Sequence, residues 1–193
     1  MALTTPAFRV SYPNVFKPKR NELSNKDEYS LEAVFPKDAD LSKLKAAATE
    51  AIENKWGKDK NKWPKALRSP FRAQADKIKR DEETGKEFLP DPYVDGATYM
   101  NLKSTNKPGV VDEQVQPIID PSKIYPGCWM RATISAYAYD QAGNRGVNFG
   151  LQNLQFVKDG DPLGGRTKPE DDFAPVGMET GSAGAQSATD LFS

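Results

Sequence analysis

Histidine is absent from the 193-residue chain, and the single cysteine is Cys128. The absence of histidine excludes nucleophiles that are activated by an imidazole base. It also excludes metal sites with imidazole ligands. A lone cysteine excludes an internal disulfide, and its setting in YPGCWMRATI is typical of a small buried thiol. No segment approaches the roughly 20 apolar residues of a membrane-spanning helix. The N-terminal MALTTPAFRV lacks the pattern of a secretion signal, so we expect an intracellular protein without membrane contact.

A net charge is also absent, because 27 basic residues balance 27 acidic ones. The charges are nevertheless segregated: residues 159–193 hold two basic and seven acidic residues, and residues 1–158 hold 25 basic and 20 acidic ones. The C-terminal segment is rich in Gly, Pro, Ser and Ala and poor in large apolar residues, so it cannot offset its ordering entropy by burial. We therefore expect one domain over 1–158 and a flexible acidic tail over 159–193.

Alternation of apolar and polar residues predicts five strands in the body of the chain. In the first of them, Phe8, Val10 and Tyr12 share the apolar face. In the last, the apolar set changes phase near Gln152 and Asn153, which predicts a β-bulge. The five strands cover residues 8–16, 28–35, 97–104, 129–139 and 147–157.

One helix is predicted over 41–56, where leucine, alanine and isoleucine recur at helical spacing. Asp38 or Asp40 can cap its first turn, and Gly57 suits the residue after its end. Residues 57–96 have no clean period, although Thr84-Gly85 is a plausible hairpin tip, and NKPGVVD reads as a turn.

These elements predict a mainly β fold with one main helix. A small curled antiparallel sheet of this size fits an OB-fold-like barrel, here with a long basic insertion at about 55–96 and the acidic tail. A β-sandwich or a half-barrel has the same strand pattern and is not excluded by it.

The insertion carries an unusual concentration of positive charge. Between Lys55 and Arg80 there are ten basic and two acidic residues, with Trp56, Trp63 and Phe71 among them. A phosphate backbone needs cations along its path, and exposed bases need flat rings to stack on, so this interleaving favours single-stranded nucleic acid. The alternative is a solvated surface whose rings anchor the insertion to the core.

Two predicted strands add a polar face with aromatic rings. Tyr99, Asn101 and Lys103 lie on one side of the third strand, and Arg131, Tyr137 and Tyr139 lie on one side of the fourth. If both faces line one groove they form a stacking platform, and otherwise they are ordinary half-exposed strands. The carboxylates of DEET and PEDDF lie in irregular stretches, and no glycine-rich loop opens a helix, so no enzyme, metal or cofactor is expected.

Several stretches resemble a family of phage single-stranded DNA-binding proteins that is distantly similar to the T7-type protein. They are TPAFRVSYPNVFKP, NLKSTNKPGVVD, YPGCWMRATISAYAYD, GVNFGLQNLQFVKDGDPLGG and PEDDF. The resemblance implies an OB-fold that binds single-stranded DNA with little sequence preference. It also implies a location in the host cytoplasm and roles in replication, recombination and repair. It also implies an acidic tail that modulates access of DNA or recruits phage or host replication and recombination proteins.

The combined interpretation assigns residues to two sites. The partner-binding tail comprises Glu170, Asp171, Asp172, Phe173, Asp190 and Phe192. The DNA-binding set comprises Lys17, Lys19, Arg20, Lys58, Lys60, Lys62, Trp63, Lys65, Arg68, Arg72, Tyr99, Asn101, Lys103, Lys107, Arg131, Tyr137 and Tyr139. A structural or assembly protein of the virion, with a basic surface, is the alternative function, and a homodimer stays open.

Overall fold

The computed structural model describes residues 2–22, 25–141 and 143–163. The strands are β1 (Leu3–Thr4), β2 (Phe8–Asn21), β3 (Lys26–Phe35), β4 (Arg72–Ala73), β5 (Lys79–Arg80), β6 (Glu87–Phe88), β7 (Thr98–Ser104), β8 (Gly109–Val111), β9 (Trp129–Gln141) and β10 (Asn144–Lys158). The helices are α1 (Ser42–Trp56) and the 3-10 turns η1 (Lys60–Lys62), η2 (Gln74–Lys77) and η3 (Pro121–Lys123). Within these residues, every helix is too short or too polar to cross a membrane.

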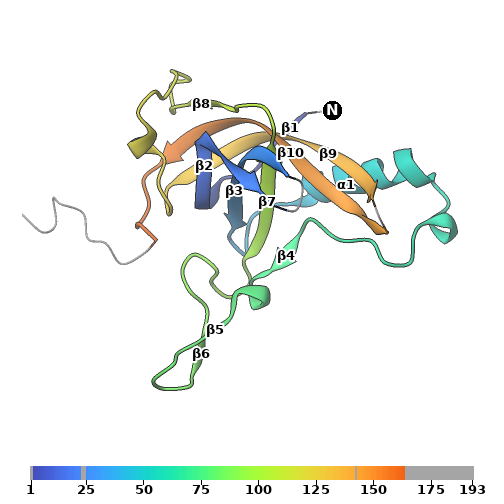
Figure 1. Ribbon diagram of the computed structural model, residues 1–193, viewed down its shortest axis with the longest axis horizontal. Helices are drawn as coiled ribbons and strands as arrows, with labels where there is room; N and C mark the ends of the chain where they lie inside the picture. Colours follow the sequence, from blue (N-terminus) through green and yellow to red (C-terminus); the bar gives the residue numbers. More distant parts are fainter. Residues whose placement is uncertain (1, 23–24, 142, 164–193) are drawn as a thin grey trace, which may run out of the picture.

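Five strands close on themselves to form a barrel (Figure 1). Strand β9 pairs with β2, β2 with β3, β3 with β7, β7 with β10, and β10 again with β9. The β7–β10 pair is parallel and the other four are antiparallel. A five-stranded barrel with one parallel closure is the OB-fold, so the predicted fold class is confirmed.

The barrel interior is filled by alternate residues of its strands, because successive side chains of a strand point to opposite faces. Phe8, Met100, Ile134 and Phe149 are almost completely buried there. Helix α1 adds Leu44 and Ala48 to the same core. Burial of a side chain of this size contributes about 1.5–3 kcal/mol, so the alternation seen in the sequence is what holds the barrel closed.

The predicted helix and bulge are both confirmed. Helix α1 starts at Ser42, whose backbone N–H donates to the Asp40 carboxylate across 2.9 Å, and Gly57 follows its end with a φ of +85°. The register of β9 and β10 shifts between Leu151 and Asn153, as the change of phase predicted.

Two local predictions are wrong. Tyr12 is 64% exposed instead of packed beside Val10, because its φ is +48° and the β2–β3 register breaks between Ser11 and Asn14. The stretch NKPGVVD contains strand β8 as well as a bend, since Gly109–Val111 pairs in parallel with β10. Both errors come from long-range pairing, which a local pattern does not contain.

The insertion passes over the outside of the barrel and is fixed there by a buried polar network. The Lys77 ammonium lies 3.0 Å from the Glu32 carboxylate and 4.6 Å from the ring centre of Tyr99. The Tyr93 hydroxyl donates to Glu32 and lies within hydrogen-bond distance of Ser11. Burial, followed by the bond to Glu32, raises the pKa of Tyr93 well above its usual range. The β5–β6 hairpin projects from this anchored region, with Gly85 at its predicted tip (Figure 1).

The chain remains packed on the barrel up to Leu163. The Leu163 N–H donates to the Pro126 carbonyl across 2.9 Å, and Arg9 donates to the Asp161 carbonyl across 2.7 Å. The Tyr125 hydroxyl donates to Asp159 across 2.7 Å. These hydrogen bonds attach a short segment that follows the expected domain boundary at 158. The tail residues assigned to partner binding, 170–173, 190 and 192, lie outside the described residues.

Candidate nucleic-acid interface

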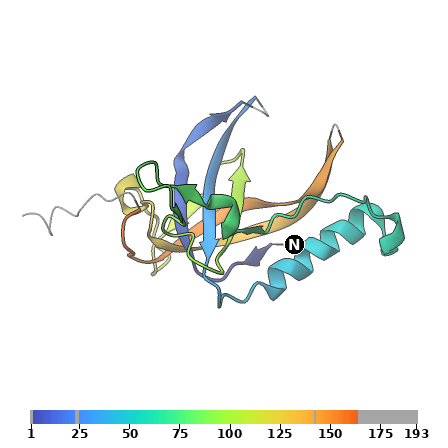
Figure 2. The ribbon, with the colours of Figure 1, turned by 90° about the horizontal axis from the view of Figure 1, so that it is seen from below.

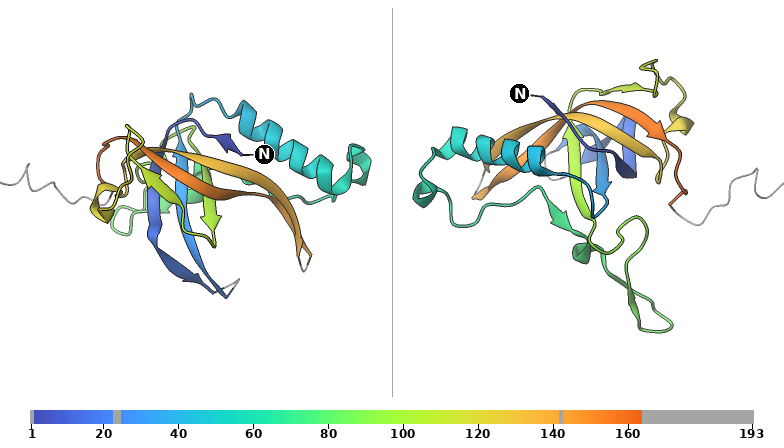
Figure 3. Two further views of the ribbon diagram at one scale, coloured as in Figure 1. Left: turned by 90° about the horizontal axis from the view of Figure 1, so that it is seen from above. Right: turned by 180° about the vertical axis from the view of Figure 1, so that it is seen from behind.

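Two long hairpins extend beyond the barrel and flank strand β7. One is formed by β2 and β3 and the other by β9 and β10, as Figures 2 and 3 show. Both hairpins are continuous with barrel strands, so their bases are held by the core. In OB-folds, oligonucleotides bind to the face of the second and third barrel strands and to the tips of these two hairpins. The second and third barrel strands are here β3 and β7.

A hollow of about 290 Å³ lies between the two hairpins on the outer surface of the barrel. Lys103 of β7 pairs in register with Gly150 of β10, and Gly150 pairs with Ser135 of β9, so these residues form one row across its floor. The lining consists of Glu28, Lys103, Ser104, Thr105, Ser135, Tyr137, Gly150, Leu151 and Gln152. The structure therefore brings two of the predicted residues, Lys103 and Tyr137, into one site.

The Tyr137 ring is presented to solvent above a residue without a side chain. Its side chain is 48% exposed, and a Cβ built on Gly150 would be 3.8 Å from the ring carbon Cε1. Partial burial raises the pKa of the phenol, and the nearby Glu28 carboxylate adds to this effect. The hydroxyl therefore stays protonated at neutral pH, and the residue offers a flat, uncharged ring in the same hollow as the Lys103 ammonium.

An ion pair crosses the hollow. The Lys103 ammonium lies 3.5 Å from the Glu28 carboxylate, which also accepts a 2.7 Å hydrogen bond from the Asn21 side chain. Lys19 pairs in register with Glu28, so both lie on the face of the β2–β3 hairpin that borders the hollow. Arg20 pairs with Asp27 instead, at 3.6 Å, on the other face of the hairpin. Lys17 is exposed on the same hairpin.

The basic turn that follows α1 is separate from the hollow. Helix α1 and this turn lie on the other side of β9–β10 from the β2–β3 hairpin (Figure 3). Trp63 is half-buried, with its indole N–H donating to the Gly57 carbonyl across 2.8 Å. This hydrogen bond holds the Trp63 ring against the residue at which the turn begins. The exposed lysines of the turn are Lys58, Lys60, Lys62 and Lys65.

Arg68 and Arg72 continue the basic segment from this turn back to the barrel. The Arg68 N–H donates to the Arg145 carbonyl of β10 across 2.9 Å, and Arg72 pairs in register with Tyr99 of β7. Both arginines are exposed. The segment thus follows the outer side of the β9–β10 hairpin and ends beside β7.

The remaining predicted residues lie around the hollow or farther away. Asn101 is exposed, two residues from Lys103 on the same face of β7, and Lys107 is exposed in the loop after that strand. Tyr139 is half-buried, with its hydroxyl over Gly146. Arg131 is exposed near the opposite end of β9, where it donates to Gln155 across 2.7 Å.

Tyr99 has to be removed from the predicted stacking residues. Its side chain is only 2% exposed and packs edge-on against Tyr93, with the ring centres 5.7 Å apart. The alternation places Tyr99 on the polar face of β7, as predicted. The insertion covers this end of that face, so Tyr99 is buried. The sequence interpretation missed Tyr12, an exposed ring 5.8 Å from the Lys77 ammonium, because it was assigned to the core.

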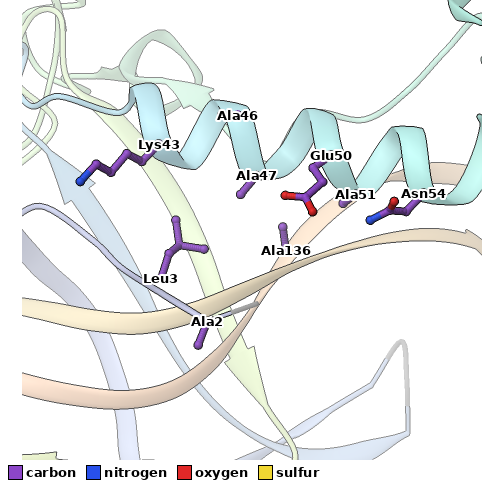
Figure 4. A pocket seen from close by; sticks show the side chains of 9 residues that line it. All are labelled: Ala2, Leu3, Lys43, Ala46, Ala47, Glu50, Ala51, Asn54 and Ala136. Atoms are coloured by element: carbon purple, nitrogen blue, oxygen red, sulfur yellow. The ribbon is translucent and has the colours of Figure 1, made fainter. Parts of the chain in front are cut away.

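A second hollow, between α1 and β9, contains none of the predicted residues (Figure 4). It is formed largely by small apolar side chains, among them Ala47, Ala51 and Ala136, with Lys43 and Glu50 among its polar residues. Short side chains here let the helix approach the strand. The described part of the chain contains no group of three or more acidic or cysteine residues placed to hold a metal ion.

Comparisons with known proteins agree with this geometry. A family model described as Enterobacter phage Enc34, ssDNA-binding protein, matches residues 1–183. Protein p50 of Acyrthosiphon pisum secondary endosymbiont phage 1 is 26% identical over 174 residues, which cover 88% of this chain and 91% of that protein.

Two solved structures share the fold at lower identity. The single-stranded DNA-binding protein from bacteriophage Enc34, in complex with ssDNA, has a TM-score of 0.63 at 21% identity, covering 84% of this chain and 89% of that one. The gp2.5 single-stranded DNA-binding protein encoded by bacteriophage T7 has a TM-score of 0.59 at 17% identity, covering 96% and 99%. Since the family model spans nearly the whole sequence, the chain belongs to the family of the phage Enc34 ssDNA-binding protein.

Proposed function

We propose that the protein binds single-stranded DNA in the hollow between its two hairpins. The observation that carries this proposal is the meeting of the Lys103 ammonium and the exposed Tyr137 ring in one site on the outer face of an OB barrel. Membership of the Enc34 family supports it, because the Enc34 protein has been solved in complex with ssDNA.

The chemistry of the hollow suits a single strand. An unpaired base stacks on the Tyr137 ring, which every base can use because every base has a π-face, and its phosphate contacts Lys103 and Lys19. A ring and two ammonium groups do not distinguish base edges, so binding is largely independent of sequence. Lys17, Arg20, Asn101, Lys107, Arg131 and Tyr139, with the basic segment from Lys58 to Arg72, extend the interface on longer strands.

We extend the proposal to a cellular role. We place the protein inside the infected cell, where it acts without catalysis in phage DNA replication, recombination or repair. Single strands exposed in these processes are its ligand. The acidic residues after 163 compete with DNA for the basic surface or bind replication proteins, since like charge repels a phosphate backbone and opposite charge attracts the lysines.

Fluorescence anisotropy of labelled oligo-dT tests the proposal, with the full chain and with a 1–163 truncation at two salt concentrations. Truncation after 163 keeps the hydrogen bonds of Asp159, Asp161 and Leu163 with the barrel. We expect binding that weakens as salt rises, because phosphate contacts release counterions. Tighter binding after truncation indicates a competing tail, and unchanged binding indicates a tail that serves partners.

Absence of binding by both proteins at low salt contradicts the proposal. In that case the basic surface is more consistent with an assembly role in the virion. Presence of the protein in purified particles would then be the next measurement.

A further inference from the structure

We propose that Glu28 limits the affinity of the hollow for DNA by competing with phosphate for the Lys103 ammonium. The inference rests on the proposed function and goes beyond it, because it assigns a residue whose removal tightens binding. A carboxylate inside a phosphate-binding groove is otherwise unfavourable, since like charges repel.

The geometry places the carboxylate beside the ammonium that a phosphate would contact. Glu28 and Lys103 line the same hollow, with 3.5 Å between Glu28 Oε2 and Lys103 Nζ. A phosphate oxygen that contacts this ammonium needs an N–O distance of about 2.7–2.9 Å. It therefore either displaces the carboxylate or lies beside it.

The carboxylate is held in place and incompletely screened. The Glu28 side chain is only 16% exposed, whereas that of Lys103 is 47% exposed. Its oxygen accepts a 2.7 Å hydrogen bond from Asn21, which is also on the β2–β3 hairpin. Partly buried charges are screened by salt much less than exposed ones, so the repulsion persists at moderate ionic strength.

The pair also affects how binding responds to salt. In the free protein, Glu28 offsets the charge of Lys103, so a phosphate that contacts this ammonium is less completely neutralised, and fewer of the cations condensed on the DNA are released. Without the carboxylate, Lys103 neutralises the phosphate more completely, and the cations that accompany this phosphate are released. The slope of log K against log salt should then become steeper by about 0.7, the contribution of one phosphate contact on a single strand.

Glu28→Gln tests the proposal, and Asp27→Asn is its matched control. Both changes remove one negative charge from the same hairpin and from an ion pair of similar length, 3.5 Å for Glu28 and 3.6 Å for Asp27. Asp27 lies on the opposite face of the hairpin, with its side chain 62% exposed. A glutamine at 28 can still accept the hydrogen bond from Asn21.

We expect Glu28→Gln to bind oligo-dT about tenfold more tightly at low salt, with the steeper slope, because the phosphate no longer competes with a carboxylate. On a short oligo-dT, which does not extend to Arg20 on the opposite face, Asp27→Asn should change the affinity less than about twofold, as removal of an exposed, screened charge does. In a Lys103→Met background, the gain from Glu28→Gln should fall below about threefold, since no ammonium remains to be competed for. Thermal unfolding of each variant checks that the hairpin is intact.

The outcomes separate this inference from the proposed function. If the unchanged protein binds oligo-dT but both carboxylate variants tighten equally, the effect is one of net charge and the inference is overturned. If Glu28→Gln folds normally and binds no more tightly, Glu28 has a structural role in the hairpin and the inference is overturned. If no variant binds oligo-dT, the proposed function itself fails.

Discussion

The carbonyl oxygen of Arg68 lies directly against Gly146 of β10. The Val147 N–H donates to this oxygen across 3.1 Å, and the Arg68 N–H donates to the Arg145 carbonyl across 2.9 Å. A Cβ built on Gly146 would be 2.5 Å from the oxygen and 2.9 Å from the Tyr139 hydroxyl. The insertion therefore runs beside β10 in an isolated parallel bridge, at a position where the strand has no side chain, and this contact places the basic segment beside the hairpin.

Gly146→Ala should lower the free energy of unfolding by about 1–3 kcal/mol, because the backbone of the insertion has to move away from the added methyl group. Urea unfolding measures the change. Gly150→Ala in the same strand is the control, since its Cβ would have no neighbour nearer than 3.6 Å. We expect a change within about 0.5 kcal/mol there. Equal stability of the two variants would mean that the insertion adjusts freely.

Tyr137→Ala should weaken binding of oligo-dT by about 1–3 kcal/mol, because a stacking ring is removed from the hollow. Tyr137→Phe keeps the ring and should bind within about twofold of the unchanged protein. Anisotropy titrations give both affinities. Equal binding by the alanine variant would remove Tyr137 from the interface, and weak binding by the phenylalanine variant would assign the role to the hydroxyl.

The basic turn after α1 should matter only for long strands, because it lies on the other side of β9–β10 from the β2–β3 hairpin. The double variant Lys60→Gln/Lys62→Gln is expected to bind a short oligo-dT normally and a long one more weakly. Its salt slope on the long strand should fall by about 0.7 for each phosphate that a lysine no longer neutralises.

Lys79→Gln/Lys86→Gln is the matched control for charge, since it removes two lysines from the β5–β6 hairpin region instead. Equal weakening in both double variants would point to the overall field of the protein. Weaker binding of the short oligonucleotide by the Lys60/Lys62 variant would mean that the binding site for short strands includes this turn.

Cys128 should be inert in the native protein. Its side chain is completely buried, and burial raises the pKa of the thiol to about 11. At pH 8 a thiol reagent should therefore label the unfolded chain and leave the native protein unlabelled. Rapid labelling of the native protein would show that this end of the barrel opens.

The same shift has a defined effect on stability. Because the folded-state pKa is raised, the unfolded chain releases the thiol proton first, from about pH 9, and the native state loses stability as pH rises toward about 11. Cys128→Ala should show a shallower decline over this range in urea unfolding.

The barrel strands and the helix could be predicted because their signals are local. Alternate burial of Phe8 and Val10, or of Met130 and Ala132, is a period-2 pattern that the sequence displays directly. The bulge after Leu151 was predictable for the same reason, since it shifts the phase of that pattern. Strand β8 was missed because its three residues depend on a parallel partner in β10.

The site was predicted in part. Lys103 and Tyr137 were both assigned to DNA binding, and they meet in one hollow because β7, β10 and β9 are neighbours in the barrel. The ion pair between Lys103 and Glu28 could not be predicted, because its partners are 75 positions apart and only the β3–β7 register joins them. The exposed ring of Tyr12 was missed because a broken register reversed its face.

The order of residues along the chain is enough to show which residues alternate, where the helix lies and that the positive charge gathers in one segment. Which polar faces stay open depends on how the folded chain packs. Tyr99 and Tyr137 have the same residue type and the same predicted place on a polar strand face, yet one is 2% exposed and the other 48%. The difference arises because the insertion packs over the first and leaves the second uncovered. Alternation assigns a side chain to a face of the sheet, and exposure depends on what distant segments of the chain cover that face.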